Sequence, residues 1–232
     1  MSLKAAEIVE TSPIKKGDYR TVLGFAGAGF IGNSATMYAI RAKGFKQVAY
    51  LKSNHLPPMT LFSNGNPMQS FRVHLDENER IIFVVTENLI PADGCRPIAL
   101  ELFEWLKLKG VKEIYSIDSL PFSNMPPEIK ALVYSYKIDL SKLGYPALKE
   151  GALSGVSSCI LDQCLEEGFP FVCLIVPTNK LTSMDYPGSA DAIDILNKVF
   201  KLGVDPSPLR GVDQTKKTAE KPSGFGKLFK KS

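Results

Sequence analysis

The sequence predicts an α/β domain in which helices cover both faces of a mixed β-sheet. Segments with strand and helix patterns alternate along most of the chain, which is typical of such a sheet. Asn64-Gly65 lies between the third and fourth predicted strands, and both residues tolerate the positive φ of a hairpin turn, so antiparallel pairs are expected as well. The chain has 232 residues, 44% hydrophobic and 22% charged, which suits one domain with a sizeable core.

The order of the elements follows from short apolar runs and from longer stretches of helical periodicity. The expected strands are residues 21–25, 47–51, 59–62, 70–75, 80–86, 113–117, 131–137 and 171–176. The expected helices are residues 31–43, 92–109, 155–167 and 189–202. In the second helix Ile98, Leu102, Trp105 and Leu106 form one apolar stripe, and Gly110 ends the helix. Trp105 is therefore expected in the core.

The domain is expected to span residues 1–204, followed by a flexible basic tail over 205–232. This tail carries seven Lys and Arg against three Asp and Glu, which accounts for the whole net charge of +4. Prolines and glycines interrupt any helix there, but Phe225, Leu228 and Phe229 lie among lysines near its end. The aromatic side chains favour a docking role, and a solvated, solubilising tail is the alternative.

Several classes of protein are disfavoured by composition. The longest apolar run, residues 169–177, is too short to cross a bilayer, and the N-terminal residues lack the pattern of a secretory signal, so we expect a cytoplasmic protein without membrane contact. The four cysteines, Cys95, Cys159, Cys164 and Cys173, have no C-x-x-C spacing and are expected to be reduced core thiols. Specific nucleic-acid binding is also disfavoured, because the body of the chain has no net positive charge.

Residues 24–33, GFAGAGFIGN, have the spacing of a dinucleotide-binding loop between a strand and a helix. The acidic residue that would hold the ribose hydroxyls is absent, because Lys52 follows the next strand; a 2′-phosphate, and hence NADP, would suit that lysine. We prefer a structural interpretation of Gly27, Gly29 and Gly32, in which the glycines permit close packing of backbone and no cofactor binds.

A second glycine-rich turn, residues 151–155, leads into the third helix with Ser154 as a reasonable N-cap. The spacing is wrong for a nucleophile elbow, so Ser154, Ser157 and Ser158 are expected to cap or pack. If the N-termini of the first and third helices face each other, an anion could bind between them.

Two acids at strand ends, Glu87 and Asp118, are the candidate catalytic residues, since α/β sheets place sites beyond the carboxyl ends of their strands. Either acid could instead cap a loop. The two histidines, His55 and His74, have no second ligand at metal-binding spacing, so no metal site is expected. No complete catalytic constellation can be assembled from spacing.

Four segments together resemble the archaeal proteasome assembly chaperone family, from about Thr21 to Phe200. They read TVLGFAGAGFIGNSATMYAI, LPPMTLFSNG, FVVTENLIPADGCRPIALELFEWLKLKGVKEIYSIDSLP and EGALSGVSSCILDQCLEEGFPFVCLIVPT. The resemblance implies a three-layer α/β domain similar to the phosphorylase/hydrolase-like fold of purine nucleoside phosphorylases, with the opening glycines as a fold signature. It also implies an oligomer that engages proteasome α subunits.

This chain departs from the family pattern in two places. Family members can dock through a C-terminal hydrophobic-Tyr-any residue signature, whereas Lys231 is the penultimate residue here. Asp118 lies in a turn where relatives often have glycine.

The leading hypothesis is a non-enzymatic, homo-oligomeric protein that binds proteasome α subunits with help from Phe225, Leu228, Phe229, Lys230 and Lys231. The first alternative is a nucleotide- or nucleoside-binding enzyme that holds phosphate near Gly29 and Ser154 and uses Glu87 or Asp118 as acid or base. The second is a scaffold whose basic tail recruits an acidic partner.

Overall fold

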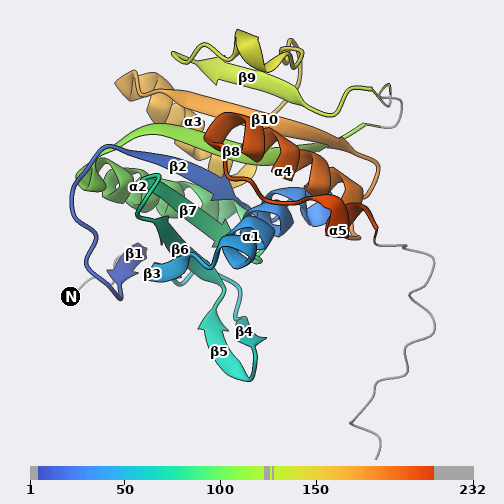
Figure 1. Ribbon diagram of the computed structural model, residues 1–232. Coiled ribbons are helices and arrows are strands. Elements are labelled where there is room, and N and C mark those ends of the chain that lie inside the picture. Colours follow the sequence, from blue (N-terminus) through green and yellow to red (C-terminus); the bar gives the residue numbers. More distant parts are fainter. Residues whose placement is uncertain (1–4, 123–125, 127, 212–232) are drawn as a thin grey trace, which may run out of the picture.

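Eight strands form one mixed sheet in the computed structural model, which describes residues 5–122, 126 and 128–211. These strands are β1 (Ala6–Glu10), β2 (Tyr19–Gly24), β3 (Lys46–Ser53), β6 (Phe71–Asp76), β7 (Ile81–Thr86), β8 (Val111–Pro121), β9 (Leu132–Tyr136) and β10 (Phe171–Thr178). Their order across the sheet is β1-β3-β6-β7-β2-β8-β10-β9 (Figure 1). The central strands β7, β2, β8 and β10 are parallel, and the flanking strands pair antiparallel.

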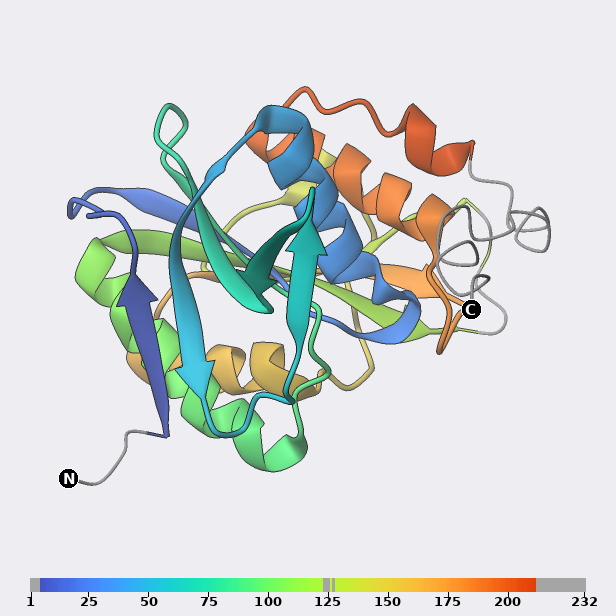
Figure 2. The same ribbon diagram turned by 90° about the horizontal axis from the view of Figure 1, so that it is seen from below.

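Helices cover both faces of this sheet, as Figure 2 shows. The helices α2 (Ala92–Lys109) and α3 (Gly155–Glu167) pack on one face, and α1 (Ile31–Lys43) and α4 (Tyr186–Phe200) pack on the other. Each face has its own apolar core, and in β7 all six residues are buried because the strand is covered on both sides. The predicted three-layer α/β fold with a mixed sheet is confirmed.

The predicted helices and central strands are present, and the differences lie near the edges of the fold. The short edge strand β1 was not predicted. The hairpin at Asn64-Gly65 is present, but β4 (Thr60–Ser63) pairs with a further strand, β5 (Asn66–Gln69), and not with β6 as predicted. Both turn residues have positive φ, 49° and 79°, as a tight hairpin requires. This hairpin projects from the body of the molecule (Figure 1).

The first residues of the predicted tail pack on the domain. The short helix α5 (Ser207–Arg210) follows α4, and Arg210 forms ion pairs with Asp191 (3.1 Å) and Asp194 on α4. The Tyr38 hydroxyl donates a hydrogen bond to the Asp205 carbonyl oxygen at 2.9 Å. The folded region therefore extends at least to Arg210, beyond the predicted boundary at 204, and the tail prediction for residues 212–232 lies outside the described residues.

Two glycines allow α1 to contact the sheet backbone directly. A Cβ atom at Gly24, at the end of β2, would lie 2.6 Å from the Gly32 carbonyl oxygen. A Cβ atom at Gly32 would lie 2.9 Å from the Phe25 carbonyl oxygen and closer still to that of Ile117 on β8. Real Cβ contacts are longer than this, so a larger residue at either position requires the helix and the strands to move apart.

We expect Gly32→Ala to destabilise the fold by about 3 kcal/mol or more, because the added methyl group meets backbone atoms that have no rotamer to change. Gly27→Ala is the matched control. Its Cβ atom would meet only the Ser119 hydroxyl oxygen, at 3.6 Å, and its φ of −154° suits any residue, so a loss of about 1 kcal/mol or less is expected. Urea unfolding followed by circular dichroism measures both, and equal losses would contradict the proposed role of Gly32.

Candidate functional site

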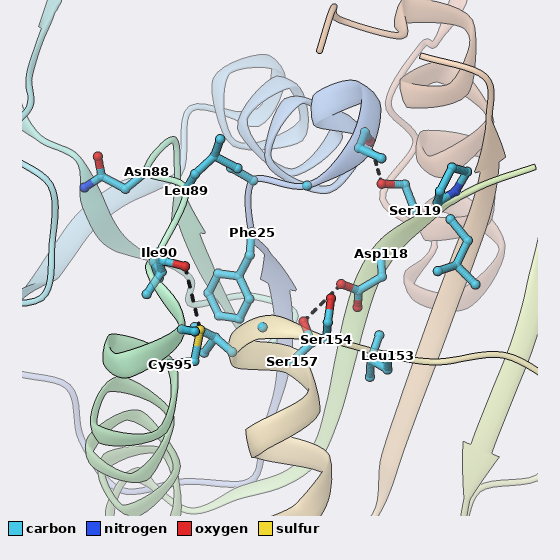
Figure 3. A pocket seen from close by; sticks show the side chains of 18 residues that line it. Phe25, Asn88, Leu89, Ile90, Cys95, Asp118, Ser119, Leu153, Ser154 and Ser157 are labelled. Atoms are coloured by element: carbon cyan, nitrogen blue, oxygen red, sulfur yellow. Dashed lines mark hydrogen bonds between the residues drawn. The ribbon is translucent and has the colours of Figure 1, made fainter. Parts of the chain in front are cut away.

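A cavity of about 510 Å³ lies at the carboxyl ends of the central strands (Figure 3). Its walls come from the loops after β2 and β7, from the last residues of β8, and from the start of α2 and of α3 with the residues just before it. The chain leaves β2 toward α1 on one face of the sheet and leaves the neighbouring parallel strand β7 toward α2 on the other face. Ligand sites of open α/β sheets lie at such reversals, so this cavity is the candidate site.

Most of the cavity wall is apolar. Figure 3 shows Phe25, Leu89 and Ile90 on one side and Leu153 on the other, next to Asp118. Leu89 is 60% exposed at the mouth of the cavity, a high value for a leucine. A ligand of this cavity would therefore bury apolar surface on both sides of a single acidic group.

Asp118 is the centre of a polar cluster that three elements bring together. Ser116 precedes it by two residues on β8, and its hydroxyl donates to Asp118 Oδ2 at 2.5 Å. Ser157 in the first turn of α3 donates to Asp118 Oδ1 at 3.1 Å. Cys173 lies on β10 directly beside Ser116 in the strand register, and its thiol contacts Oδ2 at 3.4 Å. The sequence predicts Asp118 as a candidate site residue, but it does not predict the contacts that these three neighbours make with it.

The electrostatics of this cluster are set by burial. Burial raises the pKa of Asp118, and the hydrogen bonds from Ser116, Cys173 and Ser157 only partly oppose this effect. The pKa of the Cys173 thiol is raised well above its usual value by burial and by the adjacent carboxylate. No lysine or arginine lines the cavity or pairs with Asp118 among the residues that the structure describes. The carboxyl group thus faces the cavity with neutral hydrogen-bond donors but without a compensating cation.

The start of α3 contributes backbone to the cavity wall. Ser154 occupies the predicted N-cap position, but its side chain makes no capping hydrogen bond, which corrects the expected role. Gly155 has a φ of 76°, a conformation that favours glycine, and its missing Cβ would point into open space. The backbone N–H groups of this first turn therefore lie beside the cavity without a side-chain cap.

The glycine loop forms another part of the wall, but its second glycine faces away toward α4. A Cβ atom at Gly29 would lie 3.0 Å from Asp185 Cβ and 3.1 Å from Thr178 Oγ1, and the φ of Gly29 is 64°. The Gly29 carbonyl oxygen also accepts a hydrogen bond from the Asp185 amide at 2.8 Å. Protein atoms therefore fill the space where a dinucleotide-binding loop would admit a pyrophosphate. Gly29 and Gly32 have steric reasons to be glycine that involve no ligand, whereas Gly27 has none.

The structure separates the two acids that were candidates for catalysis. Glu87 does not line the cavity; its Oε1 accepts a hydrogen bond from Arg72 Nη2 at 2.6 Å, and the Arg72 side chain is completely buried. Arg72 also donates to the Gln69 carbonyl oxygen. Glu87 therefore compensates a buried charge at the end of β7, and this contact explains its position without a catalytic role.

The histidines lie apart from the cavity wall. His74 is buried with its Nδ1 3.0 Å from the Phe45 carbonyl oxygen, and burial lowers its pKa to about 4. His55 Nδ1 lies 3.5 Å from Asp93 Oδ2. In the described part of the chain no group of three or more His, Cys, Asp or Glu could hold a metal ion. Within the same residues, none of the helices has both the length and the apolar character of a membrane span.

The cysteines are free thiols among the described residues, with Cys95, Cys164 and Cys173 buried and Cys159 partly exposed. Cys95 lines the cavity, where its thiol contacts the Pro91 carbonyl oxygen at 3.3 Å. The predicted partner-binding residues Phe225, Leu228, Phe229, Lys230 and Lys231 lie outside the described residues.

Comparison with known proteins places this architecture in a family. The model of the PAC2 family matches residues 21–218, most of the chain. The chain belongs to the PAC2 family. A search of curated proteins gave no match to this PAC2 chain.

Solved structures share the fold of this PAC2 chain. PbaA from Pyrococcus furiosus, described as an archaeal homologue of proteasome-assembly chaperone, superposes with a TM-score of 0.76 at 22% identity, over 88% of this chain and 90% of that chain. PbaB from the same organism, described as an archaeal proteasome activator, gives 0.76 at 18% identity, over 90% and 94%. A protein of unknown function from Thermoplasma acidophilum gives 0.75 at 25% identity, over 84% and 81%. The likeness to PbaA and PbaB establishes the fold.

For this PAC2 chain we expect Glu87→Ala to cost about 3–5 kcal/mol of stability, because it leaves the buried Arg72 guanidinium without its carboxylate. Glu104→Ala is the control. Its partner Lys107 is more exposed and keeps an ion pair with Glu167 at 2.7 Å, so a change within about 0.5 kcal/mol is expected. Urea unfolding measures both. If Glu87→Ala were as stable as the parent protein, the structural role would be wrong and the catalytic hypothesis would regain support.

Proposed function

We propose that this chain is a non-enzymatic, homo-oligomeric cytoplasmic protein that binds α subunits of the proteasome core particle and assists their assembly. The observation that carries the proposal is the PAC2 family match over residues 21–218. The description of PbaA as a homologue of proteasome-assembly chaperone supports the same assignment. The Cys173 thiol beside Asp118 is disfavoured as a nucleophile, because burial and the adjacent carboxylate raise its pKa well above the usual value.

The projecting hairpin β4–β5 supports a protein-binding role. Phe62 in β4 is 71% exposed, and Met59 just before the strand is 44% exposed. Large apolar side chains that gather on an exposed, projecting element are typical of contact surfaces. We propose that this hairpin contacts the α subunits directly.

Phe62→Ser should therefore reduce the amount of proteasome α subunits that co-purify with the tagged, full-length chain, by about fivefold or more if Phe62 is an anchor of the contact. Leu108→Ser is a matched control, because Leu108 is also 71% exposed but lies on α2, away from the hairpin. Equal losses in the two variants would contradict a specific contact by the hairpin. Absence of any association between the parent chain and α subunits at high micromolar concentration would refute the proposed function itself.

The basic tail is proposed to add to this contact through Phe225, Leu228, Phe229, Lys230 and Lys231. A chain that ends at Gly211 retains α5 and its ion pairs, so it removes the tail without removing packed residues. Reduced but measurable binding of this chain supports the proposal. Complete loss of binding, together with strong salt sensitivity in the full chain, would favour the scaffold hypothesis, in which the tail alone recruits an acidic partner.

A small-molecule function is the second candidate, and the cavity with Asp118 in its wall is the observation that favours it. A thermal-shift screen with NADP, nucleosides and inorganic phosphate tests it. A ligand present at about 100 times its dissociation constant would add roughly 2.7 kcal/mol of stability. We expect no shift with any of them, because the space beside Gly29 is filled by Asp185 and the cavity lining presents no cation to a phosphate. A saturable shift that Asp118→Asn abolishes would overturn this expectation.

A further inference from the structure

The carboxyl group of Asp118 has no partner of opposite charge among the described residues, although it is partly buried in an apolar cavity. Its three neighbours donate hydrogen bonds but carry no charge. A carboxylate in such surroundings is unfavourable unless a cation or further donors reach it. A ligand that brings a positive charge to the cavity would therefore stabilise the ionised form of Asp118.

The cavity also restricts what surrounds that charge. Phe25, Leu89 and Ile90 line one side of it and Leu153 lines the other, and Leu120 also belongs to the lining. A fitting ligand presents an ammonium or guanidinium group with apolar groups on both sides of it. An aromatic–lysine–aromatic peptide has this form.

The C-terminal segment of the chain, residues 222–232, contains such an arrangement. It carries three lysines and no acidic residue. In an extended peptide, side chains two residues apart project to the same side. Phe225, Lys227 and Phe229 would then share one side, and Leu228 and Lys230 the other. One side of an extended segment thus matches the order of groups in the cavity.

The last described residues lie close enough to the cavity for the C-terminal segment to reach it. Arg210 is held against Asp191 and Asp194, in the first half of α4, and the amide of Asp185 at the start of α4 bonds to the Gly29 carbonyl oxygen. Gly27 and Ala28 of the same loop line the cavity. Asp191 is five residues from Tyr186, about 8 Å along the helix. The 14 residues from Gly211 to Phe225 can span up to about 46 Å.

We propose that the cavity binds the C-terminal segment of the same chain, with the ammonium group of Lys227 beside Asp118 and with Phe225 and Phe229 against the apolar walls. This inference goes beyond the proposed function. It makes the cavity a receptor for the tail, so that the aromatic residues of the tail are covered until a partner displaces them. Its experiment uses the isolated full-length chain, so its failure leaves the binding of α subunits untouched.

The experiment places a photo-crosslinker, p-benzoyl-phenylalanine, at position 229 of the full-length chain and maps the cross-linked peptides by mass spectrometry. We expect cross-links to the cavity wall, at residues 88–92, 118–121 or 153–156. Lys227→Ala should lower the yield by about fivefold or more, whereas Lys230→Ala, which removes the same charge from the other side of the segment, should change it by less than about twofold. Asp118→Asn should match Lys227→Ala.

Lys227 lies outside the described residues, so the Lys227→Ala variant tests the proposal even if the Asp118→Asn variant fails to fold. Mixing ¹⁵N-labelled with unlabelled chains separates contacts within a chain from contacts between two copies, and we expect cross-links within one chain only. Cross-links between labelled and unlabelled chains would make a second copy the occupant and overturn the proposal. Cross-links outside the cavity, or equal yields from Lys227→Ala and Lys230→Ala, would overturn it as well.

Discussion

The contact between the start of α1 and the ends of β2 and β8 is the constraint on which the rest of the site depends. At Gly32 the backbone of α1 packs directly against the backbone of the sheet, and Gly24 leaves room for the Thr36 side chain of α1. With α1 held there, the loop between β2 and α1 must pass over the end of β8, where the Ser119 hydroxyl donates to the Ala28 carbonyl oxygen at 2.5 Å. The same loop accepts the amide of Asp185 and so fixes the start of α4. One interlayer contact therefore positions both a wall of the cavity and the first turn of a distant helix.

Two acids near the carboxyl ends of β7 and β8 acquire different roles because their surroundings differ. Glu87 lies next to a buried arginine and compensates it, so its charge is used within the fold. Asp118 lies between hydroxyls and a thiol, which can donate hydrogen bonds but cannot neutralise it. The last residues of β8 consequently present an acceptor to the cavity, and among the described residues Asp118 is the one charged side chain in the cavity lining.

The elements predicted well from the sequence have strong patterns: α2 has a regular apolar stripe over 18 residues, and β7 is a continuous apolar run because both of its faces are covered. The strands β1 and β5 are short edge or hairpin strands, and β5 contains Pro67, so neither has a strong pattern. The early start of α4 had a local signal, Asp185 as N-cap with Pro187 in the first turn. The partners of Asp118 could not be inferred in full, since Cys173 depends on the register of β10 and Ser157 on the docking of α3. The ion pair between Arg72 and Glu87 could not be predicted for a similar reason, because only the folded sheet brings the two side chains together.

The chemistry of the Asp118 cluster bears on whether the domain acts by catalysis or by contact. Nucleophilic catalysis would need Asp118 to take a proton from Ser116, Ser157 or Cys173, the three groups that contact its carboxyl group. The Cys173 thiol remains protonated because burial and that carboxylate raise its pKa. Ser116 and Ser157 also contact each other at 2.8 Å, and because each hydroxyl carries one hydrogen, the serine that donates in this contact does not donate to Asp118 at the same time. These contacts hold the Asp118 carboxyl group in place at the cavity wall. A cationic group that reached Asp118 would stabilise the ionised form of its carboxyl group, and this is the interaction that the proposed binding of Lys227 requires.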